Sequence, residues 1–255
     1  MLFPTLVLLG LLTGALIGAT GVGAGSLMTP MLIGVFRLPL PLAIGTDLCF
    51  AALTKLGGAL AHWRQGHVDR ALLARMLLGS LPACALTLLA MHLLGWARAG
   101  QGVLRTALGV ALLLTAAMIA GRGAWGRIAL RAGRRIPVAA RRALTVALGG
   151  ALGVLVTLSS VGAGAIGSTL IALLHPRLRA RRLVGTDIAH AVPLSLLAGA
   201  GHAWMGQVDW RVLAALLLGS LPGIWLGARA SAWLPERITR TLLAATLLGA
   251  GLRML

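Results

Sequence analysis

Residues 45–82 read GTDLCFAALTKLGGALAHWRQGHVDRALLARMLLGSLP, and residues 185–222 read GTDIAHAVPLSLLAGAGHAWMGQVDWRVLAALLLGSLP. With a shift of 140 residues, 17 of these 38 positions are identical without a gap. The matches include Asp, His and Pro residues in register, which a shared apolar composition would not produce. The chain is therefore expected to contain two homologous halves, an arrangement typical of secondary transporters.

The composition predicts a membrane protein. Of the 255 residues, 58% are hydrophobic and 11% are charged, whereas soluble domains carry about a quarter charged residues. The net charge of +18 would suggest nucleic acid in a soluble protein. Here the basic residues lie between apolar runs of membrane-spanning length, so no nucleic-acid partner is expected.

The sequence offers no pattern typical of an enzyme. Cys49 and Cys84 lie inside apolar runs and form no CxxC pair, so we expect neither a metal site nor a disulfide scaffold. GxSxG, HExxH and P-loop motifs are absent from the sequence. We therefore predict no catalytic residues, no metal and no cofactor.

Apolar runs predict membrane-spanning helices, which need about 20 apolar residues each. Such runs occur at 47–63, 71–95, 103–120, 187–205, 211–230 and 238–254. Two further runs, 2–36 and 143–174, are too long for one crossing, and glycines interrupt each of them. We predict an all-α polytopic membrane protein whose halves each contain one glycine-broken helix, re-entrant or discontinuous, plus three spans. The first half covers 1–120, an arginine-rich cytoplasmic loop covers 121–142, and the second half covers 143–255.

The arginines predict that the halves are inverted in the membrane. If each broken helix enters and leaves on one side, each half makes three crossings, and a cytoplasmic loop 121–142 places 17 arginines inside and five outside. If each broken helix crosses once, the halves are parallel and the split is 12 to 10. Because arginine is enriched in cytoplasmic loops, the inverted arrangement is favoured. The same loop is expected to contact anionic lipid head groups.

Several motifs, present in both halves, resemble the TauE/SafE sulfite-exporter family. In the first half these are Gly21-Val22-Gly23-Ala24-Gly25 followed by Pro30, then Ala43-Ile44-Gly45-Thr46-Asp47, then His62 and Gly66-His67-Val68-Asp69. The resemblance implies a bacterial inner-membrane protein that moves sulfite, sulfonates or related small organic anions. Two features depart from the family pattern. The second half has Ser168-Thr169 in place of Thr29-Pro30, and both halves have Asp after Gly-Thr, where many relatives have Ser.

The glycine-rich breaks are candidate anion-binding sites. Irregular backbone at membrane depth is tolerated only where it is buried in protein or lines a cavity. A helix that restarts there directs free N–H groups and its positive dipole end at the break. The alternative is that the glycines only allow close helix packing, as we expect for Gly10, Gly14 and Gly18. The candidate substrate-binding residues are Gly21, Gly23, Gly25, Ser26, Thr29, Thr46, Lys55, Ser159, Ser160, Gly162, Gly164, Ser168 and Thr186.

Lys55 is the only lysine, and it lies inside an apolar run. A charge at the centre of a membrane helix costs about 2.5–3.5 kcal/mol on insertion scales, so it requires a partner or a water-filled cavity. A substrate anion is one such partner. The alternative is that the lysine extends its ammonium group to the membrane interface. Its counterpart in the repeat is Ser195, so the predicted site is not symmetric.

Asp47 and Asp187 each follow Gly-Thr and precede an apolar run. One interpretation is a helix N-cap. The other is proton coupling, in which a desolvated carboxylate takes up and releases a proton as the site changes access. His190 lies one turn after Asp187 and is a candidate to share that proton. Asp69 and Asp209 are expected to cap the helices that follow them.

We therefore predict a multi-pass transporter of small anions in the bacterial inner membrane, with sulfite or an organosulfonate as the substrate that the resemblance implies. Proton coupling through Asp47, Asp187 and His190 is a further hypothesis. A homodimer is compatible with the sequence. Two alternatives stay open: an uncoupled anion channel, and a membrane assembly factor that transports nothing.

Overall fold

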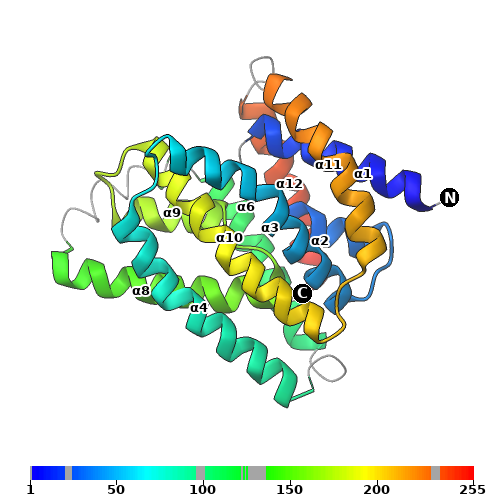
Figure 1. The fold of residues 1–255 in the computed structure, drawn as a ribbon, viewed down its shortest axis with the longest axis horizontal. Helices are drawn as coiled ribbons and strands as arrows, with labels where there is room; N and C mark the ends of the chain where they lie inside the picture. Colours follow the sequence, from blue (N-terminus) through cyan, green and yellow to red (C-terminus); the bar gives the residue numbers. More distant parts are fainter. Residues whose placement is uncertain are drawn as a thin grey trace.

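The computed structural model describes residues 2–20, 25–95, 101–121, 123, 125, 136–230 and 236–255. In these residues all regular secondary structure is helical (Figure 1), which confirms the predicted all-α class. The first half forms α1 (Leu2–Thr20), α2 (Gly25–Gly34), α3 (Leu40–Arg64), α4 (Arg70–Leu93) and α6 (Gln101–Ala120). The second half forms α8 (Val138–Ser159), α9 (Ala165–Leu174), α10 (Ala180–Trp204), α11 (Trp210–Ala230) and α12 (Glu236–Met254).

Six of these helices are long and apolar enough to cross a membrane: α3, α4, α6, α8, α10 and α11. The polytopic prediction is therefore confirmed by length and composition. The six are not all the predicted spans, however: α8 is one of them, whereas the predicted span 238–254 is not, because its apolar part, Leu243–Met254, is shorter. The two short helices, α2 and α9, have 10 residues each and follow the predicted breaks in the two long apolar runs. The inverted orientation of the halves stays a prediction.

The starts of α3 and α10 differ from the sequence prediction. We expected spans to begin at 47 and 187, but the helices begin seven residues earlier, at Leu40 and Ala180. Asp47 and Asp187 therefore lie inside helices, and the interpretation that they are N-caps is wrong. Pro39 occupies the N-cap position of α3 instead. Similarly, α8 begins at Val138, inside the predicted loop 121–142.

The helices after α3 and α10 are capped as predicted. The Asp69 carboxylate accepts a hydrogen bond from the Leu72 amide at 3.0 Å, and Asp209 accepts one from the Val212 amide at 3.0 Å. These side chains satisfy amides that lack a partner within the first turn of a helix. In each case the preceding turn contains a glycine with positive φ, Gly66 at 68° and Gly206 at 72°. Both turns therefore use the same local chemistry.

The first helix of each half packs against a helix of the other half. Helix α1 packs along α11, and α8 packs along α4, so each broken helix rests on a helix of the opposite half (Figure 1). Gly10 and Gly14 face the backbone of α11 so closely that an added Cβ would collide with main-chain atoms of Leu216 and Ser220. This confirms the prediction that these two glycines serve close packing.

The repeated Gly-Thr-Asp and Gly-x-Val-Asp motifs contact each other across the halves. The Thr186 hydroxyl accepts from the Asp69 amide at 2.9 Å, and the Thr46 hydroxyl accepts from the Asp209 amide at 2.9 Å. These contacts are equivalent under the 140-residue shift. They join α10 to the start of α4 and α3 to the start of α11. Helices α3 and α10 pack side by side at the centre of the molecule (Figure 1).

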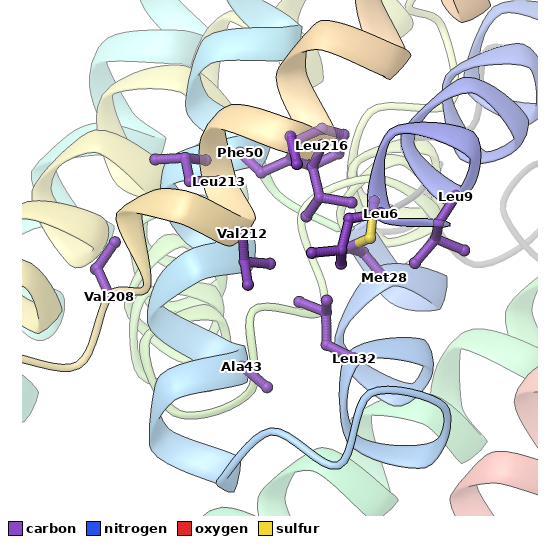
Figure 2. Close-up of a cluster of buried hydrophobic side chains, with 11 residues drawn as sticks. Leu6, Leu9, Met28, Leu32, Ala43, Phe50, Val208, Val212, Leu213 and Leu216 are labelled. Atoms are coloured by element: carbon purple, nitrogen blue, oxygen red, sulfur yellow. The ribbon is translucent and has the colours of Figure 1, made fainter. Parts of the chain in front are cut away.

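An apolar cluster holds α1, α2, α3 and α11 together. Figure 2 shows Leu6, Met28, Phe50 and Leu216, one from each of these helices, converging on it. Met28 and Phe50 are at most 1% exposed. Because the cluster anchors α2 against α3, it fixes the hydroxyl-bearing face of α2 relative to Asp47.

Candidate functional site

The candidate site is centred on Lys55 of α3. Its side chain is partly buried, and its Nζ donates a hydrogen bond to the main-chain oxygen of Ala163, 3.2 Å away. Ala163 lies in the turn between α8 and α9, which is the glycine-rich break of the second half. The lysine of one half therefore reaches the break of the other, instead of extending to the membrane interface.

The second break is an irregular segment between two helices. Helix α8 ends at Ser159, α9 begins at Ala165, and Ser160 adopts a left-handed conformation with φ of 58°. Gly162 and Gly164 have φ of 128° and 139°, values that side-chain-bearing residues rarely adopt. This conformation exposes the Ala163 carbonyl to Lys55, so these glycines are required by the shape of the site.

Asp47 lies beside this break although it belongs to α3. It is fully buried, and its Oδ2 accepts a hydrogen bond from the Thr29 hydroxyl of α2 at 2.5 Å. The Ser160 hydroxyl and the Lys55 charge also act on this carboxylate. Its other oxygen, Oδ1, and the Ser160 Oγ are buried without hydrogen-bond partners. The sequence-predicted residues Thr29, Asp47, Lys55 and Ser160 are thus brought together.

Asp187 occupies the equivalent position in α10 but has different neighbours. It is 4% exposed, and its Oδ1 is buried without a hydrogen-bond partner. A Cβ added at Gly167 would lie 2.6 Å from that oxygen, so the missing side chain of Gly167 gives the carboxylate its space at the start of α9. Lys55 interacts electrostatically with both Asp187 and Asp47.

His190 completes the buried polar groups around Lys55. Its Nε2 lies 2.9 Å from the hydroxyl oxygen of Ser80 in α4, and its Nδ1 is buried without a hydrogen-bond partner. The equivalent residue of the first half is Phe50, which belongs to the apolar cluster of Figure 2. The equivalent positions of the two halves therefore differ: His190 makes a polar contact with α4, and Phe50 makes apolar contacts in the cluster that includes α11.

Other sequence-predicted site residues use their hydroxyl groups in the framework. Thr186 donates to the Arg182 carbonyl, and Ser159 donates to the Leu155 carbonyl at 2.6 Å. Ser168 donates weakly to the Ala165 carbonyl at 3.4 Å. Gly21, Gly23 and the Ser26 side chain lie outside the described residues, while Gly25 is the first residue of α2.

Sequence reasoning missed three contributors: Ser80, Ala163 and Gly167. Ser80 belongs to the repeated LLGSLP motif, so its recurrence at Ser220 was a usable signal. Ala163 contributes its main-chain carbonyl, and Gly167 contributes by having no side chain. Such contributions have no side-chain chemistry to detect in the sequence.

Six helices of membrane-spanning length around buried charged side chains are typical of membrane transporters. The sequence model of the family described as "Sulfite exporter TauE/SafE" matches residues 6–254. The chain therefore belongs to the TauE/SafE family, and it is a multi-pass membrane transporter.

Related proteins of Bacillus subtilis (strain 168) carry transporter names. The chain is 37% identical to "Probable membrane transporter protein YjnA" over 254 residues, which are 98% of this chain and 99% of that relative. It is 27% identical to "Probable membrane transporter protein YdhB" over 258 residues, again 98% of this chain and 99% of the relative. No solved structure matches the chain.

Proposed function

We propose that this transporter moves a small oxyanion, sulfite or an organosulfonate, across the bacterial inner membrane in a proton-coupled cycle. The observation that carries this proposal is the position of Lys55, a cation inside a membrane-spanning helix whose ammonium group contacts the break at Ala163. A cation inside a membrane span marks the path of an anionic substrate or the position of a charge partner. The family description, which names sulfite export, supports the choice of anion.

The proposed anion site lies between Lys55, the Ala163 turn and the hydroxyl of Ser160. Hydroxyl and ammonium groups donate hydrogen bonds, which is what oxyanion oxygens require. The start of α9 adds the positive end of its dipole. Lys55 and Ser160 come from different halves, so the anion would be held between the halves.

Proton coupling is proposed for the buried acids of the same site. Asp47 and Asp187 are each at most 4% exposed, and both interact electrostatically with Lys55. A carboxylate with little access to water takes up a proton more readily than one in solution. Protonation of either acid would change the attraction of the site for an anion, which is the physical basis of coupling.

The test is radiolabelled sulfite counterflow in proteoliposomes, with and without an imposed pH gradient. We expect wild-type protein to show counterflow that responds to the gradient, and Lys55→Gln to lose it. The matched control is Ser195→Ala, which alters the repeat counterpart of Lys55. Flux without saturation or counterflow would favour the uncoupled channel. A folded protein that moves neither sulfite nor sulfonates would favour the assembly factor.

A further inference from the structure

We propose that a basic patch at one end of the molecule binds the phosphate head group of an anionic phospholipid, and that the bound lipid stabilises the contact between the two halves. We call this patch the basic end, and it consists of residues 64–75, 141–142 and 175–182. The lipid site goes beyond transport and is independent of the anion that the protein moves.

Helices α3 and α10 run antiparallel, so the end of one meets the start of the other. A Cβ added at Gly45, near the start of α3, would collide with the carbonyl oxygen of Gln207, which follows α10. A Cβ added at Gly185, near the start of α10, would lie 2.5 Å from the carbonyl oxygen of His67, which follows α3. The start of α10 therefore lies beside the turn that leads into α4.

Helix α8 begins at the same end as α4. A Cβ added at Gly149 would collide with the main chain of Met76, and one added at Gly153 would collide with that of Ser80, so α4 and α8 run parallel. The starts of α4, α8 and α10 lie together on the left of Figure 1. The arginines at 141 and 142, which the sequence places in a loop, thus belong to the first two turns of α8.

The segment between α9 and α10 is fixed against this end by polar and apolar contacts. The His175 Nε2 lies 2.9 Å from the Thr145 hydroxyl oxygen of α8. Leu178 and Leu183 pack against an apolar cluster that includes Leu72 of α4. The arginines next to these two leucines are left outside the cluster. Those that are exposed are Arg177, Arg179, Arg181 and Arg182.

Positive charge is concentrated at the basic end. It contains nine arginines and one carboxylate, that of Asp69, so its formal charge is +8 with histidines neutral. The Asp69 carboxylate also caps α4 by accepting from the Leu72 amide. Two arginines and one carboxylate occur at the opposite ends of the same helices, in residues 34–42, 86–95, 152–160 and 203–211. A surface with one sign of charge attracts counter-ions, so the basic end favours an anionic partner.

The position of these arginines favours a lipid over a soluble anion. Helices α4, α8 and α10 are candidate membrane spans, and their first two turns carry arginines, at the level of lipid head groups. Exposed apolar side chains follow directly along the helices: Leu144 is 44% exposed and Val184 is 38% exposed. Guanidinium groups bind phosphate oxygens through paired hydrogen bonds, and basic pockets between membrane helices bind anionic head groups. A phospholipid supplies both the phosphate and the apolar chain.

A bound head group would stabilise the contact between the halves. The Thr186 hydroxyl donates to the Arg182 carbonyl at 2.7 Å and accepts from the Asp69 amide at 2.9 Å, so the first turns of α10 are joined to the start of α4. Arginines on both sides of this contact, Arg70 in α4 and Arg182 in α10, repel each other. A phosphate between them replaces repulsion by attraction, so lipid binding and the contact should support each other.

The experiment uses the full chain, purified in a neutral detergent, and follows thermal unfolding by the loss of monodisperse protein. Phosphatidylglycerol added to the micelles should raise the midpoint by at least about 3 °C. Phosphatidylcholine, whose head group has no net charge, should leave the midpoint unchanged. Equal shifts with the two lipids would overturn the inference even if no variant folds. Glycerol 3-phosphate is the soluble probe, and a shift as large as that of phosphatidylglycerol would overturn the assignment to a lipid.

Two matched double variants locate the site. Arg179→Gln with Arg182→Gln removes two exposed arginines from the basic end and should abolish most of the shift caused by phosphatidylglycerol. Arg37→Gln with Arg211→Gln removes two exposed arginines from the opposite end and should keep the full shift. Lysine at 179 and 182 preserves the charge and should retain more of the shift than glutamine. Equal shifts in the two glutamine variants would overturn the inference.

Discussion

The ammonium group of Lys55 donates a hydrogen bond to the main-chain oxygen of Ala163, and these two residues belong to different halves of the chain. The site is therefore shared between the halves. A movement of one half against the other would change the surroundings of the lysine, which is the geometric requirement for a site that opens alternately to the two sides of a membrane.

Our first prediction concerns the orientation of the halves. If they are inverted, the turns after α3 and α10 face opposite sides of the membrane. In a background lacking Cys49 and Cys84, Gln65→Cys and Met205→Cys should react with a membrane-impermeant maleimide from opposite sides. Labelling of both from the same side would contradict the inverted arrangement and support parallel halves.

Gly167 is predicted to be essential because of its missing side chain. In Gly167→Ala the new Cβ would meet Asp187 Oδ1 at 2.6 Å, so the carboxylate or α9 must move. We expect anion counterflow to fall at least about tenfold, equivalent to about 1.4 kcal/mol, in protein that still elutes as a single species. Gly58→Ala is the control, since its Cβ would make an ordinary contact with Ile188 at 3.8 Å. Equal rates in the two variants would contradict the account.

The contacts between the repeated motifs predict a paired effect on stability. In Gly185→Ala the Cβ would lie 2.5 Å from the His67 carbonyl oxygen, and in Gly45→Ala it would collide with the Gln207 carbonyl oxygen. Because main-chain atoms yield little, each change should cost about 1–3 kcal/mol or prevent folding.

The matched control for these two variants is Gly57→Ala, where a Cβ would meet nothing within 4 Å. Thermal unfolding in detergent, followed by the loss of monodisperse protein, measures the comparison. Unchanged midpoints for Gly45→Ala and Gly185→Ala would show that the motif contacts do not support the fold.

A fourth prediction concerns pH and His175, which lies after α9 and outside the candidate spans. The Thr145 hydroxyl gives its proton to the Arg141 carbonyl at 2.7 Å, so the His175 Nε2 must donate to Thr145 at 2.9 Å. Burial, and next the positive charge of Arg141, lower the pKa of His175 below its usual 6.5.

The unfolded chain therefore binds this proton more readily than the folded protein. The stability that depends on neutral His175 is complete above pH 6.5 and is lost as the pH falls below that value toward the folded pKa. We expect the thermal midpoint to decrease between pH 8 and pH 5, and His175→Gln to reduce that decrease. A variant with the same pH dependence as the wild type would contradict this assignment.

The sequence was sufficient to predict the class of fold and part of the site. Internal repetition and apolar runs predict helices, and a lone lysine in an apolar run predicts a buried charge. The apolar pattern predicts starts of α3 and α10 that are seven residues too late, because Asp47 and Asp187 interrupt the pattern although the helices continue through them.

Contacts between the halves could not be predicted from the sequence. Ala163 reaches Lys55 through a carbonyl, and Gly167 makes room for Asp187 by having no side chain. Both depend on how α9 is placed against α3 and α10, which no local pattern specifies. The pairing of His190 with Ser80 likewise depends on the packing of α10 against α4.

The most direct test of the central claim is equilibrium binding of labelled sulfite to the purified protein in detergent. If Lys55 is the counter-charge of the bound anion, wild-type protein and Ser195→Ala should bind sulfite saturably, and Lys55→Gln should lose most of that binding while remaining folded. Binding of equal affinity in wild-type protein and Lys55→Gln would contradict the account.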